Sequence, residues 1–157
     1  MKMIFGMKTR FNYILSLLFC VCLSACHDHE EVWNQIPQPI VNFIEAYWPG
    51  TYARSYNQAK DGTISVDIAY GPGLTFTHDY GWISVDGYGE PLPQQFLFDC
   101  MPQNLYRYLE ETEATDRVFS AERNARTYEL VLLDQNLTYT IATGEIRSTP
   151  TTPTSPA

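Results

Sequence analysis

Cysteine is scarce in this chain, and most of it lies at one end. Three of the four cysteines, Cys20, Cys22 and Cys26, fall within the first 26 residues, and only Cys100 lies beyond them. A disulfide framework is therefore excluded for the main body of the chain. Asp99, the neighbour of Cys100, is expected to raise the thiol pKa and so to disfavour the reactive thiolate. These observations predict a buried structural cysteine at position 100 rather than a nucleophile.

Catalytic motifs are absent from the sequence as well. There is no G-x-S-x-G elbow, no H-E-x-x-H helix and no glycine loop that could hold a phosphate. His78-Asp79 stands alone at an expected turn, which is more typical of a solvated turn than of a base with its orienting carboxylate. We therefore expect a non-enzymatic protein with no catalytic residues, no cofactor and no metal. The alternative is a small hydrolase or thiol redox accessory that uses Cys100 or His78.

Basic residues are few in comparison with acidic ones. The chain has 10 lysines and arginines against 18 acidic residues, a formal net charge of −8 at pH 7. If residues 1–25 are removed, Lys2, Lys8 and Arg10 leave with them, and the formal charge becomes 7 − 18 = −11. A surface of this sign repels the phosphates of nucleic acid and of anionic lipid. Nucleic acid is therefore not an expected partner.

No apolar run in the sequence is long enough to span a membrane. The run from Tyr13 to Leu23 follows a basic start and is shorter than the roughly 20 residues that a spanning helix needs. It ends in Leu23-Ser24-Ala25-Cys26, which resembles a bacterial lipobox. We predict that residues 1–25 are a signal peptide and that Cys26 is acylated. The lipid would anchor the protein to the outer membrane, facing the periplasm or the cell surface. An ordinary cleavage site with an incidental cysteine is the alternative.

The stretch that follows Cys26 is polar and acidic. Residues 27–31 bring together two imidazoles and three carboxylates, which are all potential metal ligands. No apolar residue among them could fix a geometry, so a flexible tether over residues 26–35 is the favoured interpretation, and metal binding by His27 to Glu31 stays open. Acidic residues directly after a lipidated cysteine also resemble the surface-export signals of Bacteroidetes lipoproteins.

The rest of the chain contains an internal repeat. Four blocks recur in the same order, at offsets of 65 residues for the first two and 63 for the last two. The offset changes where a turn is expected, and turns tolerate changes in length. We predict that residues 36–98 and 99–147 are two copies of one unit. The matching blocks are Ile36-Pro37 with Met101-Pro102, Ile40-x-x-Phe43-Ile44 with Leu105-x-x-Tyr108-Leu109, Leu74-Thr75-Phe76-Thr77 with Leu137-Thr138-Tyr139-Thr140, and Gly81-x-Ile83 with Gly144-x-Ile146.

Each copy is predicted to hold one helix followed by about four strands. In the first copy, Pro37 precedes apolar residues at the helical spacing i, i+3, i+4 and i+7, and Pro49-Gly50 ends the helix. The second copy has Glu113-Ala114-Thr115 in place of that stop, so the end of its helix stays open. Alternating apolar and polar residues then predict the strands. They are expected near residues 52–56, 64–68, 74–77 and 83–85, and near 117–123, 127–133, 137–142 and 144–147.

The short turns between these strands favour an antiparallel meander over parallel crossovers. One strand face, which holds Leu74 and Leu137, needs an apolar cover, while the face that carries Thr75 and Thr138 suits solvent. The predicted fold class is therefore α+β: two tandem repeats of one helix plus about four antiparallel strands, with the helices packed on one face of the sheet. Residues 148–157, rich in threonine and proline, are expected to form a disordered tail.

These features together resemble a known family. The lipobox, the I-P-x-x-I-x-x-F-I…P-G helix and the meander with L-T-F-T and G-W-I are similar to PepSY-like proteins of Bacteroidetes, also called β-lactamase-inhibitor-like proteins. The resemblance covers about residues 35–147 and assigns residues 36–147 to a PepSY-like domain. It implies a helix-plus-four-strand unit that is usually duplicated, in secreted or lipid-anchored proteins, and it implies no established enzyme activity.

One stretch near the end of the first copy has the composition of a recognition patch. If Ile83 and Val85 face the core, strand alternation places Trp82 on the solvent side. An outward Trp82 with Tyr80 and Tyr88 nearby is typical of a protein-binding surface. Packing of Trp82 beneath a helix or the tail is the alternative. The sequence thus predicts a lipid-anchored envelope module that binds an unknown protein or saccharide partner.

Overall fold

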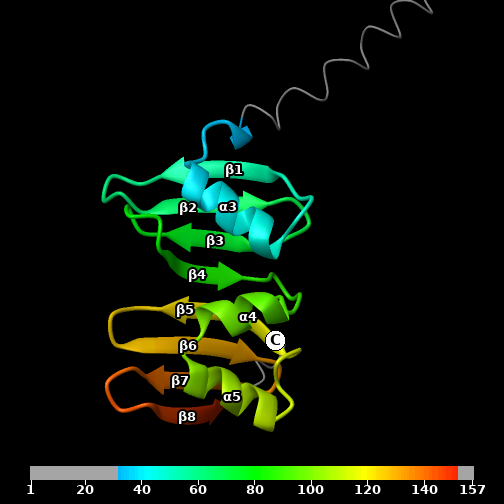
Figure 1. The fold of residues 1–157 in the computed structure, drawn as a ribbon, viewed down its shortest axis with the longest axis vertical. Coiled ribbons are helices and arrows are strands. Elements are labelled where there is room, and N and C mark those ends of the chain that lie inside the picture. Colours follow the sequence, from blue (N-terminus) through cyan, green and yellow to red (C-terminus); the bar gives the residue numbers. More distant parts are fainter. Residues whose placement is uncertain (1–31, 152–157) are drawn as a thin grey trace, which may run out of the picture.

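The computed structural model describes residues 32–151, which form one antiparallel sheet of eight strands with helices on one of its faces (Figure 1). Each strand pairs with its neighbour in the sequence, from β1 to β8. The predicted signal peptide, Cys26, the acidic cluster and residues 152–157 of the predicted tail lie outside the described residues. In chain order the elements are α3 (Gln38–Tyr47), β1 (Ala53–Gln58), β2 (Ile64–Ile68), β3 (Gly73–Phe76), β4 (Trp82–Asp86), α4 (Gln94–Cys100), α5 (Gln103–Glu111), β5 (Val118–Arg123), β6 (Thr127–Leu132), β7 (Gln135–Thr140) and β8 (Glu145–Pro150).

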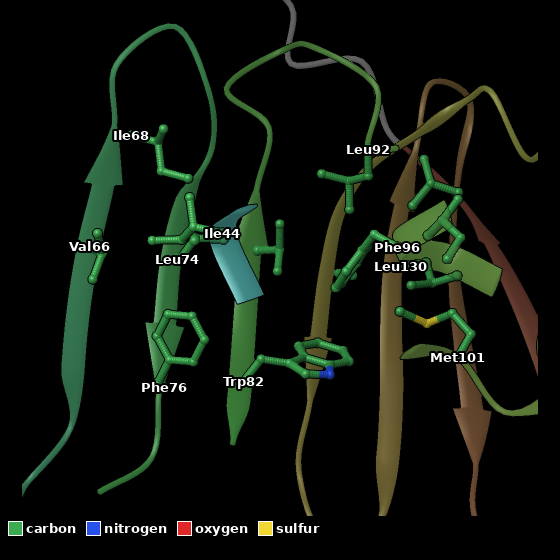
Figure 2. Packing of buried hydrophobic residues seen from close by; sticks show 14 of the residues in the cluster. Ile44, Val66, Ile68, Leu74, Phe76, Trp82, Leu92, Phe96, Met101 and Leu130 are labelled. Carbon is green, nitrogen blue, oxygen red and sulfur yellow. The ribbon is translucent and has the colours of Figure 1, made fainter. Parts of the chain in front are cut away.

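The predicted antiparallel α+β fold is confirmed, and so is the predicted buried face of the strands. Leu74 and Phe76 of β3 are buried, as are Leu137 and Tyr139 at the corresponding positions of β7. The apolar side chains of the helices close the core from the other side (Figure 2). Val85 of β4 pairs with Ala121 of β5, and both are fully buried, so the sheet and its core run without a break through the centre of the molecule.

Helix α4 was not predicted from the sequence. It begins after Pro93 and ends before Met101-Pro102, which leads into α5. The helix has 7 residues, about two turns, and its buried residues are the adjacent pair Phe96 and Leu97. Two neighbouring apolar residues in so short a segment give no helical periodicity, because periodicity needs at least one repeat of the i, i+3, i+4 spacing.

Both ends of the predicted domain extend further than expected. Val32 and Trp33, assigned to the tether, are helical and pack partly buried against the core. Residues 148–150, assigned to the tail, belong to β8, where Ser148 pairs with Leu137 and Pro150 with Gln135. Pairing continues there because the backbone groups along β7 need partners on this side.

The end of α5, left open by the sequence, is a left-handed stop. The backbone N–H of Ala114 donates to the carbonyl of Leu109 at 2.8 Å, and Glu113 between them has φ 52°. This bond spans five residues and the left-handed residue precedes its donor, which is the arrangement of a Schellman motif. Ala114 is fully buried, so the stop also fixes the chain against the core.

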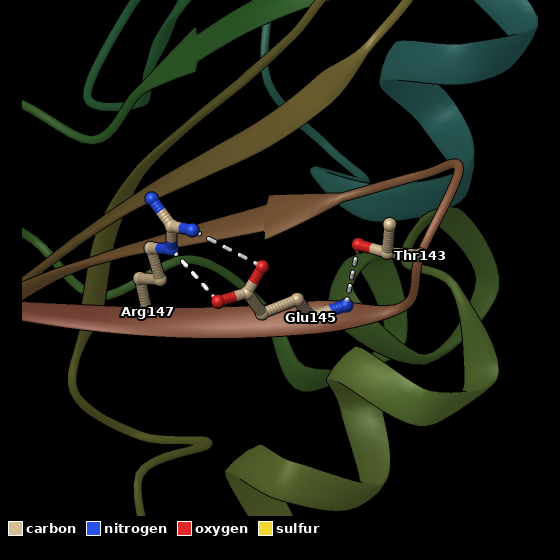
Figure 3. Close-up of polar contacts among 3 residues, drawn as sticks. All are labelled: Thr143, Glu145 and Arg147. Carbon is tan, nitrogen blue, oxygen red and sulfur yellow. Dashed lines mark hydrogen bonds and ion pairs between the residues drawn. The ribbon is translucent and has the colours of Figure 1, made fainter.

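Strand β8 forms one edge of the sheet and carries charged side chains. Arg147 donates from Nε to Oε1 of Glu145 at 2.9 Å and from Nη2 to Oε2 at 3.3 Å, and the backbone N–H of Glu145 donates to Oγ1 of Thr143 (Figure 3). The bonds to Arg147 lower the pKa of Glu145. Charges on an edge strand discourage pairing with a further strand. No helix within residues 32–151 has the length and apolar character to cross a membrane.

Candidate functional site

Trp82 lies on the buried face of β4, so its predicted exposure is wrong. In the pairing with β3, Ser84 lies opposite Thr75 but Trp82 lies opposite Phe76, which leaves Ile83 as an extra residue. Such a bulge shifts the alternation of side chains by one position. Trp82, 6% exposed, therefore joins Val85 on the core side (Figure 2).

The surroundings of Trp82 match the alternative in which it packs beneath a helix. Its ring lies 5.3 Å from the ring of Phe96 in α4, measured between centroids. Arg123 of β5 places its guanidinium carbon 4.5 Å from the centroid of Trp82 and donates from Nε to the Trp82 carbonyl at 2.6 Å. A cation over an aromatic ring is an attractive contact. Trp82 is thus a core residue that links both halves of the sheet.

The three residues of the predicted patch do not form one surface. Tyr80 lies in the turn before β4 and is 42% exposed, while Tyr88 follows β4 and is 65% exposed. The two tyrosines therefore lie at opposite ends of the same strand. Because Trp82 between them is buried, Tyr80 and Tyr88 belong to separate regions of the surface.

A cleft of about 790 Å³ lies beside Tyr88, and we call it the sheet-end cleft. Its walls come from the end of α3, the start of β1, the turn between β2 and β3, and the loop between β4 and α4. Antiparallel order brings the four segments together at one end of the sheet (Figure 1). The lining residues are Trp48, Arg54, Asp67, Ile68, Tyr70, Gly71, Pro72, Gly87, Tyr88, Glu90, Pro91, Leu92 and Pro93.

Tyr88 is fixed across the sheet by a hydrogen-bonded carboxylate. Its hydroxyl donates to Oδ1 of Asp67 at 3.0 Å, and Ser55 donates to Oδ2 of Asp67 at 2.8 Å. The hydrogen bond to Asp67 raises the pKa of Tyr88, and partial burial adds to the effect. A side chain at Gly73 would place its Cβ 2.2 Å from the Tyr88 hydroxyl oxygen. The tyrosine therefore occupies space that only a glycine in β3 leaves open.

Two tyrosines that line the cleft have a left-handed backbone. Tyr70 has φ 56° and Tyr88 has φ 52°, and Tyr80, outside the cleft, has φ 66°. This conformation costs a residue with a side chain about 1–2 kcal/mol, and it is unusual for a bulky one. The backbone N–H of Tyr88 donates to Oδ1 of Asp86 at 2.9 Å, which stabilises that turn. Tyr70 is 95% exposed.

Most of this cleft, including Trp48, Arg54, Tyr70 and Glu90, was not predicted from the sequence. One signal could have found the tyrosines, because each of the three left-handed tyrosines is followed by a glycine. A glycine marks a turn, and an aromatic residue directly before it is out of keeping with the small polar residues that turns prefer. The dipeptides are Tyr70-Gly71, Tyr80-Gly81 and Tyr88-Gly89.

Trp48 forms the apolar wall of the cleft and is held by other aromatic rings. Its ring centroid lies 5.9 Å from that of Phe96 and 6.1 Å from that of Phe43. Tilted and edge-to-face pairs at these distances are favourable. The aromatic residues of the core therefore position one wall of the cleft.

The residues named for the enzymatic alternative lie apart from the cleft lining. His78 is exposed in the turn after β3, and its Nε2 lies 3.1 Å from Oδ1 of the equally exposed Asp79. Cys100 ends α4, partly buried, with its sulfur 3.6 Å from the Tyr47 hydroxyl. Burial raises the pKa of Cys100, and Asp99 also raises it, as the sequence predicted. Among residues 32–151, no three or more His, Cys, Asp and Glu side chains come together as a metal site.

Comparison with known proteins identifies structural neighbours only. No protein-family model matches the chain, and neither does any curated protein. A candidate periplasmic protein of the DUF2874 family from Bacteroides vulgatus is similar, with a TM-score of 0.62 and 19% identity over 76% of this chain and 92% of its own. A candidate periplasmic protein of unknown function from the same species has a TM-score of 0.61 and 20% identity, covering 74% and 93%.

A third solved structure is similar to the same extent. It is a candidate calcium-regulated periplasmic protein from Bacteroides thetaiotaomicron, with a TM-score of 0.60 and 21% identity over 73% of this chain and 91% of its own. At these identities the similarity establishes the fold. The fold of the chain is thus one already seen in proteins of Bacteroides.

Proposed function

We propose that this protein is a lipid-anchored, non-enzymatic component of the bacterial envelope that binds a ligand in the sheet-end cleft. The cleft itself is the observation that carries the proposal. Its tyrosines adopt a costly backbone conformation, and such local strain in natural proteins is concentrated at functional sites. A concave site with aromatic walls and a few polar groups is the usual form of a ligand site.

Envelope location is supported by the sequence and by the neighbours. Leu23-Ser24-Ala25-Cys26 ends a signal-like segment, and the similar solved structures are described as candidate periplasmic proteins. We expect the protein to partition with membranes and Cys26→Ala to release it, with loss of the lipid mass on the N-terminal peptide. A wild-type protein that is freely soluble after export would contradict the anchor.

Membership of the PepSY-like group and duplication of its unit belong to the same proposal. The repeated blocks of sequence support it, and one structural detail supports it independently. The pairing of the first two strands in each half contains a register shift, between Ala53 and Ser55 and between Val118 and Ser120. The shifts are 65 residues apart, which is the offset of the preceding helix blocks.

Calcium does not enter the proposal, although one structural neighbour is described as a candidate calcium-regulated protein. Calcium is bound in proteins by six to eight oxygen ligands. Within residues 32–151 no group of three or more acidic, histidine or cysteine side chains could hold a metal. In the cleft, moreover, both oxygens of Asp67 already accept hydrogen bonds from Tyr88 and Ser55. The proposal therefore names no metal.

Ligand binding can be tested through the fluorescence of Trp48, which lines the cleft. Full-length protein in detergent is titrated with an envelope extract that has been separated into protein, saccharide and small-molecule fractions. We expect one fraction to change the tryptophan emission, and the change to be lost in Tyr70→Gly but kept in Tyr80→Gly. Equal responses of the two variants, or no response to any fraction, would overturn the proposal.

The enzymatic alternative is tested separately with probes for reactive thiols and for hydrolases. Because the Cys100 thiol has a raised pKa and His78 is exposed to solvent, we expect no specific labelling of either. Labelling that disappears in Cys100→Ser or His78→Ala would favour an enzyme.

A further inference from the structure

We infer that the sheet-end cleft binds a neutral saccharide, an inference that rests on the proposed binding function. The first observation is the set of aromatic residues in the cleft wall, Trp48, Tyr70 and Tyr88. A sugar ring has an apolar face of C–H groups as well as hydroxyls. An aromatic side chain provides a flat apolar surface for that face, and a tyrosine adds a polar group at its end.

The second observation concerns the charged groups of the cleft, Arg54 and Glu90. Neither Arg54 nor Glu90 forms a side-chain hydrogen bond or ion pair with another residue between 32 and 151. A guanidinium has five donors and no acceptor, while a carboxylate has only acceptors. Sugar hydroxyls both donate and accept, so a saccharide can bond to both groups at once.

The charges of these groups favour an uncharged ligand. Arg54 repels a cation, and Glu90 repels an anion. The chain as a whole carries a formal net charge of −8, which further disfavours anionic ligands. Each oxygen of Asp67 accepts one hydrogen bond, from Tyr88 and from Ser55, so this carboxylate holds Tyr88 in position in the cleft.

The conformation of Tyr70 is the third observation. It has a left-handed backbone with φ 56° and is 95% exposed, and its side chain makes no ring contact or hydrogen bond with residues 32–151. No side-chain contact of Tyr70 with residues 32–151 therefore offsets the cost of this conformation, whereas contact with a ligand ring would. Glycine adopts the same conformation without that cost. We therefore assign Tyr70 to ligand binding rather than to folding.

The experiment is a titration of the full-length protein in detergent with neutral, anionic and cationic oligosaccharides. Binding is measured by tryptophan fluorescence and by calorimetry. We expect neutral oligosaccharides to bind, with an affinity that changes less than about twofold when salt is raised, because no charge is paired. Tyr70→Gly is expected to lower the affinity at least about tenfold, as the loss of an aromatic anchor does. The melting temperature of Tyr70→Gly should equal or exceed that of the wild type.

Tyr80→Gly is the matched control, because the same residue is replaced in the same backbone conformation outside the cleft lining. It should gain stability in the same way and keep the wild-type affinity. Arg54→Gln and Glu90→Gln should each weaken binding. Preference for charged oligosaccharides, or equal affinities of Tyr70→Gly and Tyr80→Gly, would overturn the saccharide assignment.

The outcomes also separate this inference from the proposed function. If a peptide or protein fraction binds in a Tyr70-dependent manner and no oligosaccharide does, the saccharide assignment fails and the binding function stands. If no fraction and no oligosaccharide shows a response that depends on Tyr70, both fail.

Discussion

The two halves of the sheet share one plan and differ at one end. Each half runs from a helix into four antiparallel strands, with a register shift at the start of the first strand. In the first half, however, residues 69–72 join β2 to β3, whereas only residues 133–134 join β6 to β7. The longer turn carries Tyr70. A loop after β4, residues 87–93, carries Tyr88 and Glu90, whereas β8 is the last strand described.

The cores of the two halves also differ in the kind of side chain that they contain. In the first half the helix and sheet meet through aromatic rings, with Phe43 of α3 5.3 Å from Phe76 and 6.0 Å from Phe96. In the second half the buried residues of β6 and β7 are Leu130, Leu132 and Leu137 together with Tyr139. The first half therefore differs from the second in the aromatic contacts of its core and in the longer connections around the cleft.

Truncation of matched core leucines is the strongest test of this common plan. Leu74 and Leu137 are both buried at corresponding positions of β3 and β7. Leu74→Ala and Leu137→Ala should each lower the free energy of unfolding by about 2–5 kcal/mol, as other core truncations do. Thr75→Ala and Thr138→Ala, on the opposite face, should change it by no more than about 0.5–1 kcal/mol. Denaturant melts of the four variants measure this, and a costlier threonine than leucine in either half would break the equivalence.

How far the sequence could predict the fold is clear from the same strands. The alternation of Leu74 and Phe76 with threonines depends on one strand alone, so the buried face could be predicted correctly. The bulge at Ile83 depends on how β4 pairs with Thr75 and Phe76 of β3, and that pairing is invisible in the pattern of β4 itself. Because this bulge could not be predicted, Trp82 was wrongly placed on the solvent side of β4.

The candidate site was harder to predict than the fold. Tyr88 was identified from the aromatic composition of the stretch around it. The other lining residues Trp48, Arg54 and Tyr70 lie on three other segments of the chain. Only the antiparallel order of the strands brings these segments to one end of the sheet. A site assembled from turns and loops leaves no periodic pattern, because loops follow no repeat.

A second test concerns the response of the two halves to alkaline pH. Burial raises the pKa of Tyr47 and of Cys100, and the hydrogen bond to Asp67 raises that of Tyr88. In each case the folded protein keeps a proton that the unfolded chain releases, at about pH 8.5 for cysteine and about pH 10 for tyrosine. Their contribution to stability is therefore present below these values and falls as the pH rises above them.

Urea melts between pH 7 and pH 11 measure this loss. The wild-type midpoint should fall above about pH 8.5, and the double variant Tyr47→Phe, Tyr88→Phe should fall less steeply above about pH 10. Among residues 118–151, which hold β5 to β8, the shifted pKa values are instead those of the exposed pair Glu145 and Arg147, and the lowered pKa of Glu145 affects stability only in acid. A wild-type midpoint that stays constant to pH 11 would contradict this difference between the halves.

The smallest expected effect on stability is at the ends of α3 and α5, where each half has a different residue in a left-handed backbone conformation. The chain leaves α3 through Gly50, with φ 78°, and leaves α5 through Glu113, with φ 52°. Glycine adopts this conformation freely, and a residue with a Cβ does so at a cost. Glu113→Gly should therefore raise the free energy of unfolding by about 0.5–1 kcal/mol. The gain is reduced because glycine also makes the unfolded chain more flexible. Gly50→Ala should lower it by about 1 kcal/mol through backbone conformation alone, because a Cβ at Gly50 would meet no atom within 4 Å. Melts of the two single variants measure both changes, and effects of the same sign would mean that the two helix ends are not alternative forms of one stop.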